Sequence, residues 1–223
     1  MEVRFTPNIP EEAIFGVLYE PLARDFPKVE NLPALQLPPQ IRNVNPQLRF
    51  QSTYRLRSKD YVIAIGPRVF SVGIVMPYPG WAAFRNKLEG VFGTLIEKGI
   101  VKQLQRLGLR YVNVFEGDVT PRLTLQTKLA GNRIDGYKTY FRTTLERNGS
   151  KLLLQIAKDQ TVKRPPDFNR QGTSIDIDVS QTATEALDLG KLEAFIDQAH
   201  LTEKELFFEL LQPDLLKELH PAY

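Results

Sequence analysis

Two carboxylates lie two residues apart in a segment where apolar and polar residues alternate strictly. Ile175, Ile177 and Val179 alternate with Asp176 and Asp178, a pattern typical of a strand with one buried face. Side chains two apart on a strand point the same way, so both aspartates would share one face. Such a pair can hold Mg²⁺ or Ca²⁺, or divide acid and base roles. The simpler interpretation is a solvated strand face, which needs polar residues in any case.

Two further acids, Glu116 and Asp118, follow the apolar segment LRYVNVF at 109–115. They would complete a metal site with Asp176 and Asp178 if the two strands ended together. These four carboxylates define one hypothesis, a metal-dependent hydrolase acting on phosphate esters.

Arg110 and Asn113 are the polar interruptions of that apolar segment. Because they are three residues apart on an expected strand, their side chains fall on opposite faces. A buried arginine needs a charged partner, and the acids of the Asp176 strand or of the C-terminal segment could supply it. We interpret Arg110 as one half of an ion pair. The alternative is that Arg110 and Asn113 bind a ligand or a partner.

Three cations, Arg55, Arg57 and Lys59, alternate with Tyr54 and Leu56 and would share one face of a strand. Such a face could hold an anion or a nucleic-acid backbone. Sheet-based RNA-binding proteins present aromatic side chains on the same face as the cations, whereas Tyr54 faces away from them. A solvated face is therefore the favoured interpretation, and nucleic-acid binding is a less favoured alternative.

The sequence lacks the residues that several kinds of catalytic chemistry require. It contains no cysteine and only two histidines, His200 and His220, both near the C-terminus. Thiol nucleophiles and Cys-bearing zinc sites are therefore excluded, and Ser-His-Asp chemistry has no well-placed base. There is no glycine-rich phosphate loop, and no cofactor is expected.

The charge of the chain is divided unevenly along its length. Residues 1–173 hold 26 Lys and Arg against 15 Asp and Glu, a net of +11, whereas residues 174–223 hold 3 against 11, a net of −8. Acidic helices that present their charges to water would explain this. A sharper interpretation is that the acidic segment lies near the basic body, in its own chain or a neighbouring one, and screens it. A sequence pI near 9.0 is then weak evidence for nucleic-acid binding.

The periodicity of apolar residues predicts alternating runs of strands and helices. A strand is expected over 12–22, followed by an irregular proline-rich connector over 26–46 and a hairpin over 50–75. Amphipathic helices are expected from Trp81 to about Gly99 and over 100–107, and strands over 109–115, 121–130 and 137–146. Asn148-Gly149 predicts a tight hairpin turn, 174–179 a strand, and the acidic segment 184–223 helices, with a Thr202–Glu205 capping box starting one and Pro213 another.

This order predicts an α+β fold, in which a large antiparallel sheet carries a central amphipathic helix and C-terminal helices packed on one face. We expect a single domain over 1–223. The apolar stretches are shorter than the roughly 20 residues that a membrane span needs, and the N-terminus does not read as a signal peptide. A cytoplasmic protein with no membrane association is therefore expected.

The chain also resembles a known family, through stretches that span nearly its whole length. They are Tyr19-Glu20-Pro21-Leu22, Phe26–Glu30, Leu37-Pro38-Pro39, Tyr78…Trp81…Phe84, Leu109–Asn113, Ile175–Asp178 and Ala199-His200…Phe207. In this order they resemble a sporadically distributed family of uncharacterised prokaryotic proteins of unknown function. The resemblance implies a single-domain α+β protein of the cytoplasm and no particular activity. It also implies a helix between the first strand and the proline-rich connector, which the sequence at 23–25 suggests has been deleted here.

The leading functional hypothesis is a non-catalytic binding or interaction protein, such as an accessory or toxin-neutralising partner. A protein partner or self-association is expected, because extended strand edges invite added strands. The apolar cluster of Phe207, Phe208, Leu210 and Leu211 exceeds what one helix face needs and suggests a dimer. The metal-dependent hydrolase and a basic nucleic-acid-binding surface are the alternatives.

Overall fold

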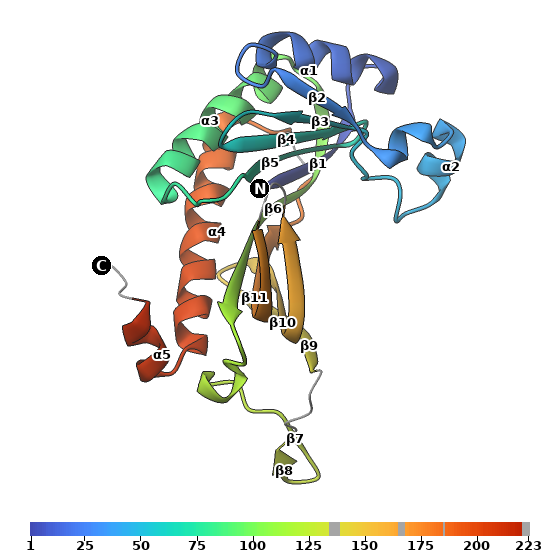
Figure 1. Cartoon of the computed structure of the whole chain (residues 1–223). Helices are drawn as coiled ribbons and strands as arrows, with labels where there is room; N and C mark the ends of the chain where they lie inside the picture. The colour runs from blue at the N-terminus through green and yellow to red at the C-terminus, as the bar shows by residue number, and fades with distance from the viewer. Residues whose placement is uncertain (134–138, 165–167, 185, 220–223) are drawn as a thin grey trace. The chain divides into compact units, whose positions relative to one another are not determined.

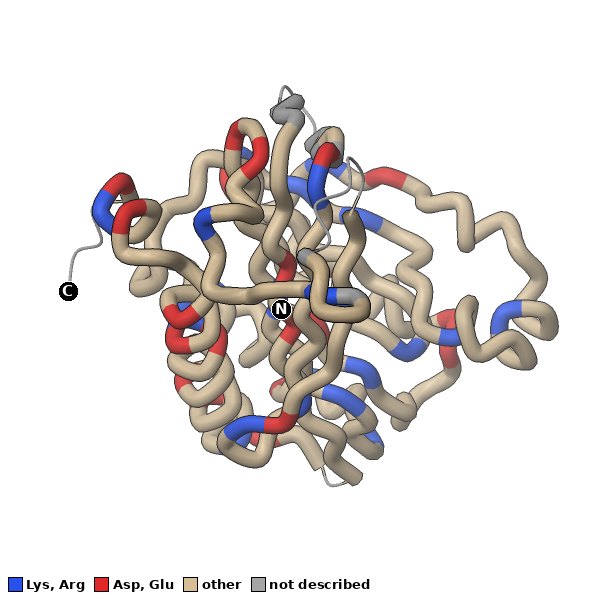
Figure 2. Tube along the Cα trace, turned by 90° about the horizontal axis from the view of Figure 1, so that it is seen from below, with Lys and Arg blue, Asp and Glu red and all other residues tan. Residues whose placement is uncertain are grey.

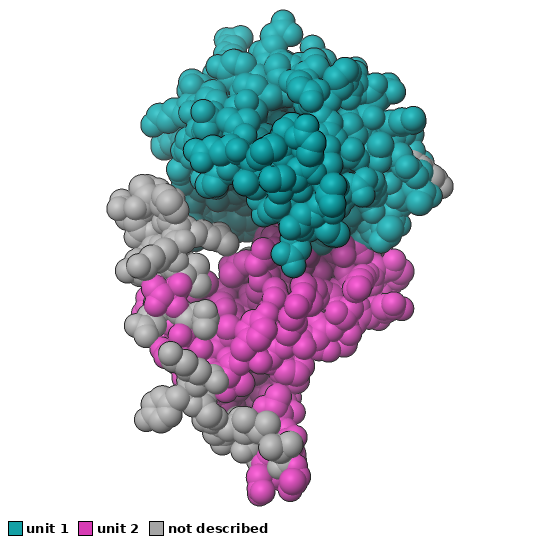
Figure 3. All heavy atoms as spheres, turned by 90° about the vertical axis from the view of Figure 1, so that its right-hand side faces the viewer, with its two compact units in different colours: residues 1–108, 181–197 teal, residues 109–180, 198–223 magenta. Residues whose placement is uncertain are grey.

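The fold is α+β and is built on a large antiparallel sheet. The computed structural model describes residues 1–133, 139–164, 168–184 and 186–219 (Figure 1). Nine strands form the sheet in the order β2-β3-β4-β5-β1-β6-β11-β10-β9, and β7 and β8 form a separate small hairpin. The chain divides into two compact units, residues 1–108 with 181–197 and residues 109–180 with 198–223, coloured separately in Figure 3. Each is described by itself.

Unit 1 contains an antiparallel sheet with two helices on it. Its strands are β1 (Glu2–Pro7), β2 (Lys28–Asn31), β3 (Tyr54–Arg57), β4 (Tyr61–Gly66), β5 (Val69–Ile74) and the first half of β6 (Val101–Glu116). Its main helices are α1 (Ile14–Leu22) and α3 (Trp81–Glu97), with the short α2 (Pro39–Val44) and the 3-10 turns η1 (Glu11–Ala13) and η2 (Pro33–Gln36) between strands. Helix α1 contacts β4, α3 contacts β5, and the two helices contact one another. They therefore cover the same face of the sheet.

The core of unit 1 forms where apolar stripes of these helices meet the sheet. Helix α3 buries residues at three- and four-residue spacing, as an amphipathic helix should, and α1 buries one residue on each turn. Phe92 of α3 meets Phe70 of β5 edge to face, with ring centroids 5.3 Å apart, an arrangement that favours aromatic pairs. The buried helix residues are Phe84, Leu88, Val91, Phe92 and Leu95 on α3, and Ile14, Leu18 and Leu22 on α1.

Unit 2 pairs the second half of β6 with a long hairpin and the C-terminal helices. Its strands include β9 (Tyr140–Arg147), β10 (Ser150–Arg164) and β11 (Phe168–Gln181), with β7 (Lys128–Leu129), β8 (Asn132–Arg133) and the 3-10 turn η3 (Thr120–Arg122) in the connection. Its helices are residues 198–210 of α4 (Leu189–Leu210) and α5 (Pro213–Glu218). One face of β10 and β11 is buried, through Leu152, Leu154, Ile156, Ile175, Ile177 and Val179.

Two local predictions are confirmed with the backbone geometry that motivated them. The turn between β9 and β10 is Asn148-Gly149, with φ of 52° and 71°, the left-handed values that a primed two-residue turn requires. Helix α3 begins at Trp81 and is followed by Gly99 at φ 61°, the conformation with which helices commonly end. The α+β fold class is confirmed as well.

The prediction of a strand over 12–22 is wrong, because this segment forms α1. Pro21 lies in the last turn, where the helix is about to end, and Ile14, Leu18 and Leu22 provide a buried stripe with a period of four. The first strand is instead β1, at Glu2–Pro7. A helix therefore does occupy the position before the proline-rich connector, and the inferred deletion is wrong.

The prediction of a helix over 100–107 is also wrong, because these residues begin β6. Phe5 of β1 faces Leu104, but Arg4 faces Arg106, so Gln105 is an extra residue on β6. Such a bulge shifts the alternation by one position, and the buried Leu104 and Leu107 then stand three residues apart on one face. That spacing imitates a helical stripe in the sequence.

Smaller differences occur in the connector and the C-terminal third. The segment 26–46 holds β2, η2 and α2 and is not wholly irregular, and 121–130 contains only η3 and the two-residue β7. Helix α4 runs without a break through Thr202, which is buried and accepts hydrogen bonds from the side chains of Gln198 and Asn148. The capping box expected at Thr202 is therefore wrong, whereas α5 does start at Pro213.

The single domain stays a prediction. Among the described helices, none combines the length and the apolar character needed to cross a membrane.

The buried Glu203 of α4 gives the first prediction. Only 5 % of this residue is exposed, and burial raises the pKa of its carboxyl from 4.5 to about 7. The folded state therefore holds this proton more tightly than the unfolded state, so unfolding free energy falls as pH rises from the unfolded pKa through the folded one. Glu203→Gln removes this loss and should add about 2 to 3 kcal/mol at about pH 8, but almost nothing below about pH 4.

Urea unfolding of both proteins at the two pH values measures this difference. The matched control is Glu205→Gln on the same helix, where the side chain is exposed and the change should be the same at both pH values. Equal gains for Glu203→Gln at low and high pH would contradict the assignment.

Candidate functional site

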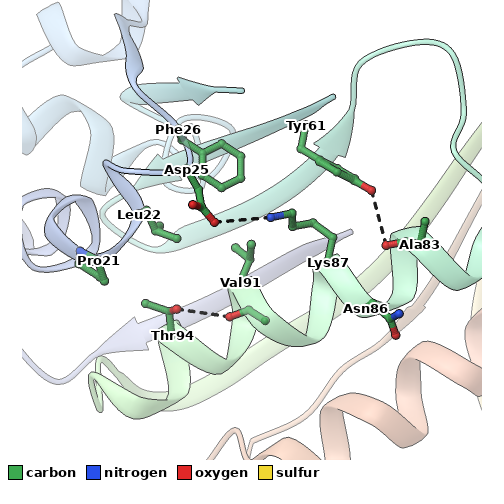
Figure 4. Close-up of a pocket in the computed structure, with 11 residues that line it drawn as sticks. Pro21, Leu22, Asp25, Phe26, Tyr61, Ala83, Asn86, Lys87, Val91 and Thr94 are labelled. Carbon is green, nitrogen blue, oxygen red and sulfur yellow. Dashed lines mark hydrogen bonds and ion pairs between the residues drawn. The ribbon is translucent and has the colours of Figure 1, made fainter. Parts of the chain in front are cut away.

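A pocket of about 500 Å³ lies in unit 1 between α1 and α3 (Figure 4). One side is the end of α1 and the residues after it, the other is the outer flank of α3, and Tyr61 enters from β4. Its lining is Pro21, Leu22, Asp25, Phe26, Tyr61, Ala83, Asn86, Lys87, Gly90, Val91 and Thr94.

The helical period of α3 places these residues at the pocket. Leu88 and Phe92 point into the core, so the residues one step around the helix, Lys87, Gly90 and Thr94, must face α1. Gly90 leaves this wall open, because an added Cβ would meet no atom within 4 Å. The floor is apolar, since Leu22, Phe26 and Val91 are each no more than 5 % exposed.

Lys87 supplies the positive charge of the pocket. Its Nζ lies 5.5 Å from the ring centroids of both Phe26 and Tyr61, within the range of cation–π attraction. It lies 3.8 Å from Oδ2 of Asp25, whose side chain is 67 % exposed. Figure 4 shows the ammonium group reaching from α3 across the opening toward Asp25. The Lys87 side chain is 29 % exposed, and a partly exposed pair at this distance contributes little stability, so a ligand can replace Asp25 as the partner of Lys87.

The two hydroxyl groups at the pocket donate to backbone carbonyls. Tyr61 Oη donates to the carbonyl of Ala83 at 3.5 Å, and Thr94 Oγ1 donates to the carbonyl of Gly90 at 3.3 Å (Figure 4). Their protons are thus directed toward α3 and not toward a carboxylate or an imidazole. A nucleophilic hydroxyl needs such a base within hydrogen-bond reach. Neither of the two hydroxyls therefore has such a base as its hydrogen-bond acceptor.

The basic residues predicted at 55–59 lie on and beside β3, outside the pocket. Arg55 and Arg57 both form ion pairs with Glu30 of the neighbouring β2, at 3.2 and 3.5 Å. Lys59 is exposed in the turn that leads to β4. One acid thus partly neutralises two of the three cations, which weakens the case for a nucleic-acid surface here.

Arg110 forms the ion pair that the sequence suggested, although its side chain is 58 % exposed and not buried. Its guanidinium donates to both oxygens of Asp176, at 2.8 and 2.5 Å. Gln155 donates to Asp176 Oδ2 at 3.0 Å, and Tyr140 Oη donates to Gln155 Oε1 at 2.5 Å. These four residues form a polar ladder across β6, β11, β10 and β9. Arg110 is therefore held by its own chain.

Asn113 falls on the other face of β6, as its spacing from Arg110 predicted. Its neighbours of the same parity, Tyr111 and Phe115, contact α4: Tyr111 lies 5.9 Å from the His200 ring, and Phe115 stacks on Phe207 at 6.3 Å between centroids. Arg110 and Asn113 thus do not converge on one ligand site. His220 lies outside the described residues.

The four carboxylates of the metal hypothesis are not brought together into an ion site. Asp176 is engaged by Arg110 and Gln155, whereas Asp118 pairs with Lys158 at 2.6 Å. Burial opposes the charged form of Asp118, but hydrogen bonds from Lys158 and Thr120 outweigh it and hold the pKa below its usual range. Across the described ranges, no group of three or more His, Cys, Asp or Glu could hold a metal ion. The convergence of Glu116 and Asp118 with Asp176 and Asp178, on which the metal hypothesis was conditional, is thus not found among these residues.

Acids of the C-terminal segment pair with arginines of the same chain. Arg85 of α3 binds Asp197 with two hydrogen bonds, at 2.7 and 2.9 Å, inside unit 1. In unit 2, Arg147 binds Glu209 in the same bidentate way, and Arg122 contacts both Asp214 and Glu218. Figure 2 marks the charged residues along the trace. The acidic segment thus neutralises part of the basic body within its own chain, which was the sharper of the two interpretations.

The apolar cluster near the C-terminus packs within unit 2. Leu210 and Leu211 are 6 % and 4 % exposed, and Phe207 stacks on Phe115 as described. The sequence suggested a dimer surface from these residues, but their packing within the chain removes that argument.

Sequence reasoning missed the pocket, because it placed a strand where α1 lies. With α1 assigned as a helix, the signal would have been the polar flank of α3, where Asn86, Lys87, Gly90 and Thr94 recur at helical spacing beside the buried stripe. No protein-family model, no curated protein and no solved structure matches this chain. The function therefore has to be argued from the geometry alone.

The ion pair of Arg110 gives a second prediction. Arg110→Met leaves the carboxylate of Asp176, only 11 % exposed, without its bidentate donor. We expect a loss of about 1 to 3 kcal/mol in unfolding free energy, because a shielded charge loses its partner. The control is Lys151→Met on the same sheet face, an exposed position that should cost less than about 0.5 kcal/mol. Chemical unfolding measures both variants. Equally small losses of unfolding free energy would contradict a stabilising role for the Arg110–Asp176 ion pair.

Proposed function

We propose that this chain is a binding protein and that the α1–α3 pocket holds a small organic anion with an apolar, preferably aromatic, body. The observation that carries the proposal is the position of Lys87. A single cation stands between two aromatic rings above an apolar floor, in a space of about 500 Å³. Ligand pockets commonly have this size, and the lining here combines apolar residues with five polar or charged ones.

The ligand class follows from the two kinds of surface in the pocket. A carboxylate, sulfonate or phosphate would take the place of Asp25 beside Lys87, gaining a charge-assisted hydrogen bond. The remainder of the molecule would contact the ring of Tyr61 and the small exposed parts of Leu22, Phe26 and Val91, where apolar contact is favourable. Asn86 and the hydroxyl of Tyr61 stand at the rim and could bind further polar groups. A larger polyanion is not favoured, since Asp25 would repel its additional charges.

Binding without catalysis is supported by where the hydroxyl protons point and by the groups in reach. Lys87 has a carboxylate beside it, and the Tyr61 and Thr94 hydroxyls donate to helix carbonyls. The alternatives draw less support: the carboxylates of the hydrolase hypothesis are separately engaged, and many basic residues are paired with acids. An accessory role for the chain, such as neutralising a toxin, stays a proposal beyond this one.

Charge-selective binding gives the third prediction. We expect indole-3-acetate to bind more tightly than indole-3-acetamide, which has nearly the same shape but no charge. Lys87→Met removes the ammonium while keeping most of the apolar stem. It should weaken the acetate about 10-fold or more and change the amide less than about 2-fold. Isothermal titration calorimetry on the four combinations measures this.

The matched control is Lys98→Met. Lys98 follows α3 and pairs with Glu20 of α1 at the same distance, 3.8 Å, but it does not line the pocket. It should leave both affinities unchanged. A second pair tests the location: Gly90→Leu should block both ligands, whereas Gly93→Leu, also in open space on α3, should block neither. Equal losses in Lys87→Met and Lys98→Met, or binding unaffected by Gly90→Leu, would contradict the proposal.

A further inference from the structure

Strand β9 is the free edge of the sheet in unit 2. It runs for eight residues, Tyr140–Arg147, and among the residues that the structure describes it pairs with β10 alone. The other end of the sheet order is β2, which has four residues, one of them a lysine. Short edges and edge lysines discourage added strands. The sequence of β9, YFRTTLER, holds no proline, glycine or lysine. Its charged residues are two arginines and a glutamate, which favour a partner strand that places opposite charges across from them.

The turn geometry defines which backbone groups of β9 are free. Arg147 and Ser150 flank the two-residue turn, and such a pair exchanges hydrogen bonds across the hairpin. Odd-numbered residues of β9 therefore point their N–H and C=O groups toward β10. The hydrogen bond from Lys158 N–H to the carbonyl of Thr139 agrees with this parity. The even-numbered residues 140, 142, 144 and 146 thus direct their backbone groups outward.

We propose that two copies of this chain form a two-fold dimer by pairing β9 with β9, antiparallel, with Thr144 on the axis. An antiparallel pair needs outward-facing residues opposite one another. With Thr144 opposite Thr144, Arg142 of each copy faces Glu146 of the other. Both side chains are exposed, and neither has an ion-pair partner among the residues that the structure describes.

Charge selects this register over its neighbours. Moving the axis to Arg142 would place two arginines opposite one another, and moving it to Glu146 would place two glutamates together. Axes at Thr143 or Leu145 are compatible with the backbone, but they leave Arg142 and Glu146 opposite uncharged residues. Opposite charges directly across an antiparallel pair stabilise it, and like charges destabilise it. The register with Thr144 on the axis alone satisfies both charges, and it does so twice by symmetry.

Charge exchange tests the dimer. Sedimentation equilibrium should find the wild-type chain as a dimer. Arg142→Glu and Glu146→Arg should each weaken association at least about 10-fold, because each places like charges across both pairs. An equimolar mixture of the two variants should form a heterodimer, since acidic then faces basic at both positions. The double variant should dimerise as the wild type does.

Cysteine cross-linking tests the register independently, because the chain has no cysteine of its own. Thr144→Cys places two cysteines across the axis with Cα atoms about 5.5 Å apart, which a disulfide can span. Tyr140→Cys is the control, because it leaves the Arg142–Glu146 pairs intact and its two copies would lie about 27 Å apart. Oxidation should link the first variant as a dimer and not the second.

Each outcome bears on the proposal. A wild-type chain that is monomeric from micromolar to near-millimolar concentration overturns it. So does a dimer that survives both single charge reversals, or a variant mixture that does not associate. Circular dichroism of each variant separates loss of association from loss of folding. Because β9 lies outside the α1–α3 pocket, failure here leaves the ligand proposal intact.

Discussion

The packing of α3 onto β5 is the interaction on which the candidate site depends. One apolar stripe, from Phe84 to Leu95, fixes the rotation of the helix about its own axis. Arg85 then holds α3 to Asp197 by two hydrogen bonds. Because this stripe faces the sheet, the side chain of Lys87 on the neighbouring flank of the helix points toward the end of α1. The pocket thus results from two helices that pack side by side on one face and separate where α1 ends.

Electrostatic pairing within the chain has a wider consequence. Arginines 85, 110, 122 and 147 each hold acids from residues 174–223. The strong charge division seen along the sequence is therefore reduced in the folded chain, and less positive potential is left for a polyanion. Lys87 differs from these arginines because its Nζ lies 3.8 Å from Asp25, whereas each arginine holds an acid at 2.9 Å or less. An anionic ligand can therefore replace Asp25 beside Lys87 with little loss of free energy.

Much of the fold could be predicted from periodicity, and the failures have specific physical causes. The α3 stripe and the Asn148-Gly149 turn are local signals, and local signals were sufficient for both. The sequence does not predict α1, because Pro21 disfavours a helix, whereas in the folded chain the packing of its buried stripe outweighs that preference. The start of β6 was missed because a bulge at Gln105 depends on the register with β1, a pairing of distant residues. The pocket could not be predicted without α1. The partnership of Arg110 with an acid of the Asp176 strand followed from charge, although the premise that Arg110 is buried is wrong.

The most direct test of the account is to map a bound anion by nuclear magnetic resonance. In a ¹H–¹⁵N titration with indole-3-acetate, the account predicts that the largest shift changes fall on the amides of Asp25, Phe26, Tyr61 and residues 86–94. Saturation with increasing ligand should show one site. Shifts that concentrate elsewhere, for example on β3 or on the ladder of Arg110 and Asp176, would contradict the claim that the α1–α3 pocket is where this protein binds.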